Sequence, residues 1–143
     1  MTSETRRLAG ILMVVLPTVM FGGVSLLSLL AGAEPGYVDN PVRQGLWRAG
    51  HAHAGVWLVL SLVLLRYVDE ADLSPGARRF ASLAAPVAAI LVPAAFFLSI
   101  LSPTATRPNG LINLAYVGGV VLAAGVVTLG VGLIRAASEG GTR

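Results

Sequence analysis

Hydrophobic residues gather in four long runs that are separated by short polar segments. The runs cover residues 8–31, 46–67, 80–101 and 111–134. A membrane-spanning helix needs about 20 consecutive apolar residues, and each run is long enough. Only helices or closed barrels satisfy the backbone inside lipid, and these runs lack the two-residue alternation of barrel strands. The pattern therefore predicts an all-α fold, with four transmembrane helices in one membrane domain over residues 1–143.

The segments between the runs are short and rich in turn signals. Pro35-Gly36 and Asn40-Pro41 lie in the first connection, Ser74-Pro75-Gly76 lies in the second, and residues 102–110 form the third. Short connections favour antiparallel neighbours in a helical protein. We therefore expect an up-down-up-down four-helix bundle.

The arginines are unevenly divided between the two ends of this bundle. One end would hold seven of them: Arg6, Arg7, Arg66, Arg78, Arg79, Arg135 and Arg143. The other end would hold Arg43, Arg48 and Arg107. The positive-inside rule then places both termini in the cytoplasm. We expect a multi-pass protein of a bacterial cytoplasmic (inner) membrane, with the first run retained as a helix because it is longer than the hydrophobic part of a signal peptide.

Composition agrees with this assignment. The chain is 55% hydrophobic and 12% charged, whereas a soluble domain carries about 25% charged residues. The basic residues are scattered between hydrophobic runs, so the expected partner is the lipid bilayer and not nucleic acid. The absence of cysteine excludes disulfides, thiolate metal ligands and thiol nucleophiles.

The two histidines of the chain, His51 and His53, open the second hydrophobic run. Ionisable side chains inside a membrane span are expensive and are functional candidates by default. Residues two apart on a helix differ by about 200°, so the two rings point to nearly opposite faces. They cannot chelate one metal together while the segment is helical, and we expect each to serve a different neighbour.

Other polar and small residues fall at a comparable depth on the remaining runs. Ser25, Asn113 and Tyr116 are candidate polar members of the same site, and pairs of glycines such as Gly22 and Gly23 make this half of the bundle roomy. At the inner end, an acidic run of Asp69, Glu70 and Asp72 is expected to be solvated. Glycines 118, 125 and 132, seven residues apart, predict a close helix seam within the bundle or between protomers.

One stretch resembles a known family. Gly50-His51-Ala52-His53-Ala54-Gly55-Val56 is similar to the His-x-His helix of heme–copper oxidases and nitric oxide reductases. In that family the first histidine ligates the high-spin heme and the second the low-spin heme, so the resemblance implies these roles for His51 and His53, with heme b as cofactor. It covers seven residues, and the chain lacks the further helices and histidine ligands of a complete oxidase or reductase. As a whole, the chain also resembles small bacterial four-helix integral membrane proteins.

A heme site needs more than one histidine, and the sequence offers candidates. Met20 is a candidate second axial ligand, with Met13 as the alternative on the same run. Arg48 and Arg107 are candidates to pair with propionates. Alternatively, His53 meets its copy in a homodimer, which supplies two histidine ligands. Such a protein would transfer electrons or sense a small ligand.

Two other interpretations remain open. In the first, the histidines form hydrogen bonds with Ser25, Asn113 or Tyr116 and hold helices together. The protein would then be a structural or accessory subunit of a larger respiratory complex, would pack through its glycine seam and would carry no cofactor. Alternatively, the histidines bind copper or another metal. The sequence has no carboxylate pair or nucleophile–base motif in a span, so we do not expect an enzyme that acts alone.

Overall fold

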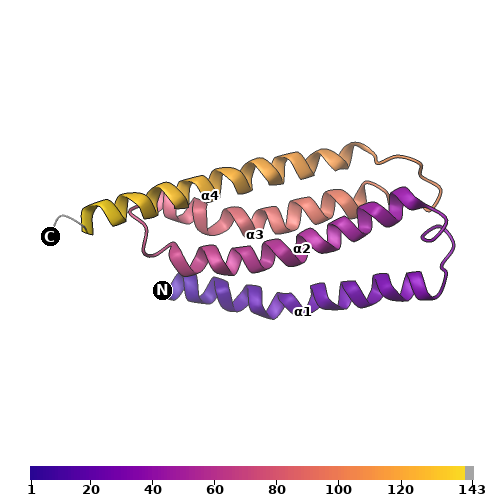
Figure 1. The fold of residues 1–143 in the computed structure, drawn as a ribbon, viewed down its shortest axis with the longest axis horizontal. Helices are drawn as coiled ribbons and strands as arrows, with labels where there is room; N and C mark the ends of the chain where they lie inside the picture. The colour runs from indigo at the N-terminus through magenta and orange to yellow at the C-terminus, as the bar shows by residue number, and fades with distance from the viewer. Residues whose placement is uncertain (141–143) are drawn as a thin grey trace.

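The computed structural model describes residues 1–140, with side chains through residue 138, and folds them into four α-helices. These are α1 (Ser3–Ala31), α2 (Pro41–Tyr67), α3 (Pro75–Leu98) and α4 (Asn113–Gly140), with a short 3-10 turn, Gly110–Ile112, before α4. The connections alternate between the two ends of the molecule, and the described chain ends lie at the same end (Figure 1). As labels only, we call this end the inner end and the opposite one the outer end. The described residues contain no β-strand, which confirms the all-α prediction.

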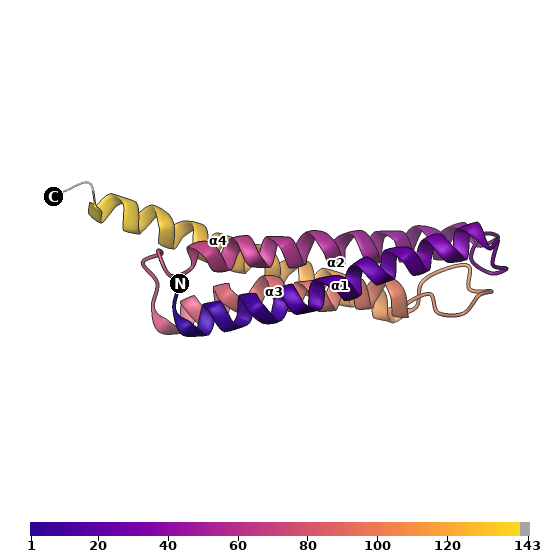
Figure 2. The ribbon, with the colours of Figure 1, turned by 90° about the horizontal axis from the view of Figure 1, so that it is seen from below.

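All four helices are long and apolar enough to cross a membrane. An α-helix rises about 1.5 Å per residue, so the 29 residues of α1 extend about 44 Å. The hydrocarbon core of a bilayer is about 30 Å thick, so α1 is long enough for its terminal turns to reach the headgroup region. The last turns of α4 project beyond the other helices (Figures 1 and 2). Arg143, one of the arginines in the orientation argument, lies outside the described residues.

The first three helices each begin five residues earlier than their hydrophobic runs, and the starts of α2 and α3 fall on predicted turn signals. The Asn40 side chain accepts a hydrogen bond from the backbone N–H of Arg43 at 3.0 Å, and Pro41 occupies the first helical position. Likewise, the Ser74 side chain accepts a hydrogen bond from the backbone N–H of Ala77 at 3.3 Å, and Pro75 occupies the first helical position of α3. These sequences are N-caps followed by proline, which suits the first turn because its N–H groups have no partner in the helix. The turn signals at both places are thus helix starts.

Close packing of α3 against α4 depends on small residues. The buried face of α3 carries alanines 81, 84, 85, 88 and 95. A Cβ built on Gly125 of α4 would lie 2.2 Å from the Cβ of Ala84, and one built on Gly118 would lie 2.7 Å from a methyl group of Val92. The glycine seam therefore packs inside the chain, which decides between the two predicted places. It is not free to hold a partner subunit, as the accessory-subunit hypothesis required.

The first helix lies at the edge of the fold. It packs mainly on α2, α2 packs on α3, and α3 packs on α4. The residues of α1 that are buried, Thr5, Ala9 and Leu12, all lie in its first half. Ala9 and Leu12 join a core cluster with Leu58 and Leu65 of α2. The rest of α1 rests on α2 without a buried side chain of its own, and this opens space between the two helices.

Candidate functional site

The ring of His51 lies in the seam between α1 and α2. It packs against Gly22 and Gly23: a Cβ built on Gly23 would lie 2.9 Å from His51 Nε2, and one built on Gly22 would lie 3.8 Å from Nδ1. The missing side chain at Gly23 is therefore what admits the imidazole. Among the described residues, His51 has no hydrogen-bond partner.

Two hollows adjoin His51 along this seam, with volumes of about 530 and 620 Å³. Both are lined by His51 and Ala52 from α2. On α1 their lining includes positions 16, 20, 23, 27 and 30, which recur every three or four residues and therefore form one stripe. We call the two hollows together the α1–α2 groove. Its inner part is almost entirely apolar, and His51 stands where the two parts meet.

Two of the predicted heme-site residues line the same groove. Met20 of α1, a residue that is 67% exposed, lines its inner part. Arg48, one turn before His51 on α2, lines its outer part together with Tyr37. The structure thus brings His51, Met20 and Arg48 to one groove between two helices. Met13 lines neither part.

The second histidine faces a different helix, as its spacing from His51 predicts. Its ring lies edge-to-face with Trp57 and with Phe96 of α3, at centroid distances of 5.0 and 5.2 Å. His53 Nδ1 lies 2.7 Å from the carbonyl oxygen of Ala49. Because a carbonyl only accepts, Nδ1 carries the proton, and in the neutral ring Nε2 is the unprotonated nitrogen. His53 therefore joins α2 to α3 and lies away from the groove.

The other candidate polar residues do not converge on the histidines. Ser25 donates to the carbonyl of Phe21 in its own helix. Asn113 and Tyr116 lie exposed on α4, Tyr116 at 73%, and α4 packs on α3 whereas His51 packs on α1. Arg107 is exposed in the α3–α4 connection and lines neither part of the groove. Equal depth did not bring these residues together: α4 is not a neighbour of α1, and Ser25, although it lies on α1, donates its hydroxyl to its own helix.

An aromatic cluster at the outer end was not foreseen from the sequence. Tyr37, from the α1–α2 connection, is 2% exposed and lies 6.0 Å from Trp47, which in turn lies 6.0 Å from Phe97 of α3. The guanidinium of Arg43 stands 4.1 Å over the Trp47 ring and donates to the carbonyl of Gly36. This cluster fixes Tyr37 at the mouth of the groove. No periodic signal marks a tyrosine whose place depends on how a loop folds.

At the inner end, Asp69 ties the start of α1 to the α2–α3 connection. Its carboxylate accepts hydrogen bonds from the backbone N–H of Thr2 and the hydroxyl of Thr5, both at 2.6 Å, and lies 3.9 Å from Arg78. Burial opposes its ionisation, but the bonds from Thr5 and Thr2, the N-terminal ammonium and Arg78 together hold its pKa below the ordinary value. Asp72 is exposed, as expected, and Glu70 pairs with Arg66 at the surface. The expectation of a solvated carboxylate is wrong for Asp69, whose side chain is only 11% exposed.

No group of three or more histidine, cysteine, aspartate or glutamate residues that could hold a metal ion occurs in the part of the chain that the structure describes. His51 and His53 face different helices, so they do not form the start of such a group either. The described residues therefore offer no ligand set for the metal-site hypothesis.

Comparison with protein families, curated proteins and solved structures finds no match to this chain in any of the three. Interpretation of the site therefore depends on its geometry.

Proposed function

We propose that the chain is a multi-pass protein of a bacterial cytoplasmic membrane that binds a b-type heme in the α1–α2 groove. Its four apolar helices support the membrane location. The proposed topology is up-down-up-down with both termini in the cytoplasm, supported by the alternating connections and the arginine distribution. In this orientation the groove opens to the outer leaflet.

The observation that carries the proposal is the set of three side chains along one groove. His51 has the imidazole that commonly ligates heme iron, and Met20 on the facing helix has the thioether that serves as a second axial ligand. Arg48 stands at the outer part, where propionates would meet water and a guanidinium can pair with them. The apolar walls and the volumes of the two hollows fall in the range of small-molecule sites.

Each residue has a definite part in this arrangement. His51 Nε2 is turned toward α1, and ligation requires the ring to rotate into the groove, for which Gly23 and Gly55 leave room. Arg48 orients the polar edge of the ligand toward the surface. The heme would supply one-electron chemistry or an iron site for a small gas, so the protein would transfer electrons or sense a ligand.

An absorption spectrum of the detergent-purified protein, expressed with ample heme and recorded before and after reduction with dithionite, tests the proposal. We expect a Soret band that is lost in His51→Ala and retained in the matched variant His53→Ala. Met20→Ala is expected to keep the heme but to change its reduced bands and to open a position for carbon monoxide. A colourless wild-type protein contradicts the proposal, and loss of heme only in His53→Ala contradicts its placement.

A second function is favoured by a specific observation, the packing of both histidines. His51 fills a notch made by Gly22 and Gly23, and His53 packs on Trp57 and Phe96. These contacts suit a structural or accessory subunit without a cofactor, in which the histidines join α2 to its two neighbours. Such a subunit would contact its complex through a face other than the glycine seam, which α3 fills. The same spectrum separates the two functions, since this one predicts no Soret band and a loss of thermal stability in both alanine variants.

A further inference from the structure

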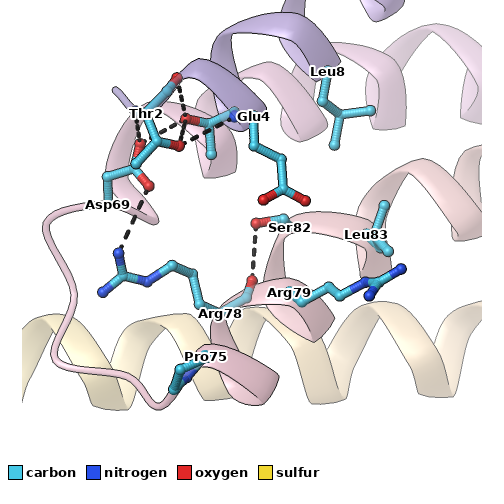
Figure 3. Close-up of a pocket in the computed structure, with 10 residues that line it drawn as sticks. Thr2, Glu4, Leu8, Asp69, Pro75, Arg78, Arg79, Ser82 and Leu83 are labelled. Carbon is cyan, nitrogen blue, oxygen red and sulfur yellow. Dashed lines mark hydrogen bonds and ion pairs between the residues drawn. The ribbon is translucent and has the colours of Figure 1, made fainter.

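A cavity of about 330 Å³ lies at the inner end of the molecule, far along α1 from His51. It is formed by the first turns of α1 and α3 beneath the α2–α3 connection (Figure 3). Asp69 with its hydrogen-bond donors Thr2 and Thr5, which we call the Asp69 clamp, lines one side, and Ser82 and Leu83 of α3 line the other. Nothing in the proposed heme site uses these residues.

Two opposite charges in this cavity are unpaired. Among the described residues, Glu4 of α1 and Arg79 of α3 line it without a hydrogen bond or an ion pair, and no dashed line reaches either charged group in Figure 3. Arg78 also lines it, and its guanidinium lies 3.9 Å from Asp69 and donates to the carbonyl of Ala71 at 3.5 Å. In Asp69, Oδ2 accepts from Thr2 and Thr5, whereas Oδ1 has no hydrogen-bond partner and lies 3.9 Å from Arg78. The cavity therefore offers a carboxylate on one helix and guanidinium groups on the other.

An apolar floor lies below these charges. Leu8 follows Glu4 by four residues on α1, and Leu83 follows Arg79 by four residues on α3. Residues four apart share a helix face, so each leucine lies one turn deeper in the membrane than the charge of its own helix. Because these first turns extend to the headgroup region, the cavity runs from polar at the membrane surface to apolar at the start of the acyl chains.

We propose that this cavity binds the headgroup of a zwitterionic aminophospholipid of the phosphatidylethanolamine type. The phosphate pairs with Arg79 and Arg78, and the primary ammonium donates to Glu4. Leu8 and Leu83 contact the first methylenes of the acyl chains. A headgroup that carries only negative charge is disfavoured, since Glu4 and Asp69 face the same space. This inference needs the helices to lie in a membrane but is independent of heme.

Native mass spectrometry of the full chain, purified and delipidated in detergent, tests this binding. Phosphatidylethanolamine, phosphatidylcholine and phosphatidylglycerol with identical acyl chains are added at equal concentration. We expect the ethanolamine lipid to be retained best, because choline has no N–H to donate and glycerol has no cation for Glu4. Arg79→Gln is expected to weaken its retention about fivefold, the effect of one arginine at a lipid surface.

Matched variants and a soluble competitor sharpen the result. Arg135→Gln, at an exposed position of α4, removes an equal charge outside the cavity and should leave retention unchanged. Glu4→Gln is expected to abolish the preference for ethanolamine over glycerol lipid, while the exposed Asp72→Asn preserves it. Soluble phosphoethanolamine, which lacks acyl chains, should compete poorly. Equal retention of the three lipids, an Arg79→Gln variant that binds like wild type, or effective competition by soluble phosphoethanolamine would each overturn the proposal.

Discussion

Moving a single methyl group from α3 to α4 tests whether the glycine seam of α4 packs against α3. The built Cβ of Gly125 lies 2.2 Å from the Cβ of Ala84 and 3.7 Å from its Cα. Gly125→Ala therefore creates a contact about 1.5 Å shorter than ordinary carbon–carbon separation. Ala84→Gly in the same chain removes the opposing methyl and leaves only the 3.7 Å contact, which is ordinary.

The expected free energies follow from that geometry. Gly125→Ala forces the two helices apart along a tightly packed seam, and overpacking of this kind costs about 1–3 kcal/mol. The gain in helix propensity, about 1 kcal/mol, offsets only part of this cost. Ala84→Gly alone loses about the same propensity and leaves a small void. The double variant moves the methyl from one helix to the other and should lie near wild type, with a coupling energy of about 1–3 kcal/mol.

Thermal unfolding in detergent, followed by circular dichroism, measures these differences. Gly130→Ala is the control on the same helix, because a Cβ there meets no atom within 4 Å. It should be neutral or slightly stabilising. Additive effects of Gly125→Ala and Ala84→Gly, or a Gly125→Ala variant as stable as the control, would refute the conclusion that this seam is internal to the chain.

Two further predictions concern the ends of the α1–α2 seam. The depressed pKa of Asp69 means that its contribution to stability is present above about pH 4, the ordinary carboxyl value, and is lost as pH falls through the folded-state pKa. The difference in melting temperature between wild type and Asp69→Asn should therefore shrink on acidification, and a constant difference from pH 7 to about pH 2 would contradict the clamp. At the other end, Gly23→Ala should leave the cofactor-free protein about 1–2 kcal/mol less stable than Gly22→Ala, because its Cβ would lie 2.9 Å from His51 Nε2 and that of Gly22 3.8 Å from Nδ1, while both gain the same helix propensity. Equal melting temperatures of the two alanine variants would show that the ring does not depend on this notch.

The number and approximate extent of the helices follow from the hydrophobic runs, and the opposite directions of the two histidines follow from helical geometry. Both depend on local periodicity, which a sequence records directly. The seven-residue spacing of Gly118, Gly125 and Gly132 likewise predicted a close seam. It could not say which helix fills that seam, since a glycine leaves the same space for any partner.

Residues that depend on which helices are neighbours were not predictable in this way. Tyr116 and His51 were expected to lie together because their predicted depths are similar. His51, however, packs on α1, whereas Tyr116 lies on α4, and α4 is not adjacent to α1. Asp69 belongs to an acidic run that looks like an ordinary polar loop. Its role arises from contact with Thr2 and Thr5, more than sixty residues earlier. Such contacts between distant segments leave no local pattern in a single sequence.

The two ends of the α1–α2 seam differ in how tightly they are packed. Near the start of α1, Ala9 and Leu12 are in the core and Asp69 holds the first turn, so separation of the helices there would expose apolar surface and leave a buried carboxylate without its donors. Beyond Leu12 no described residue of α1 is buried, so displacement of its outer part exposes only half-buried side chains such as Leu16 and Val19. A ligand that enters the groove from the membrane therefore needs to move only the free part of α1 while the clamp keeps the inner end in place. This makes the outer seam, with His51 at its centre, the part of the fold where binding costs the least packing energy.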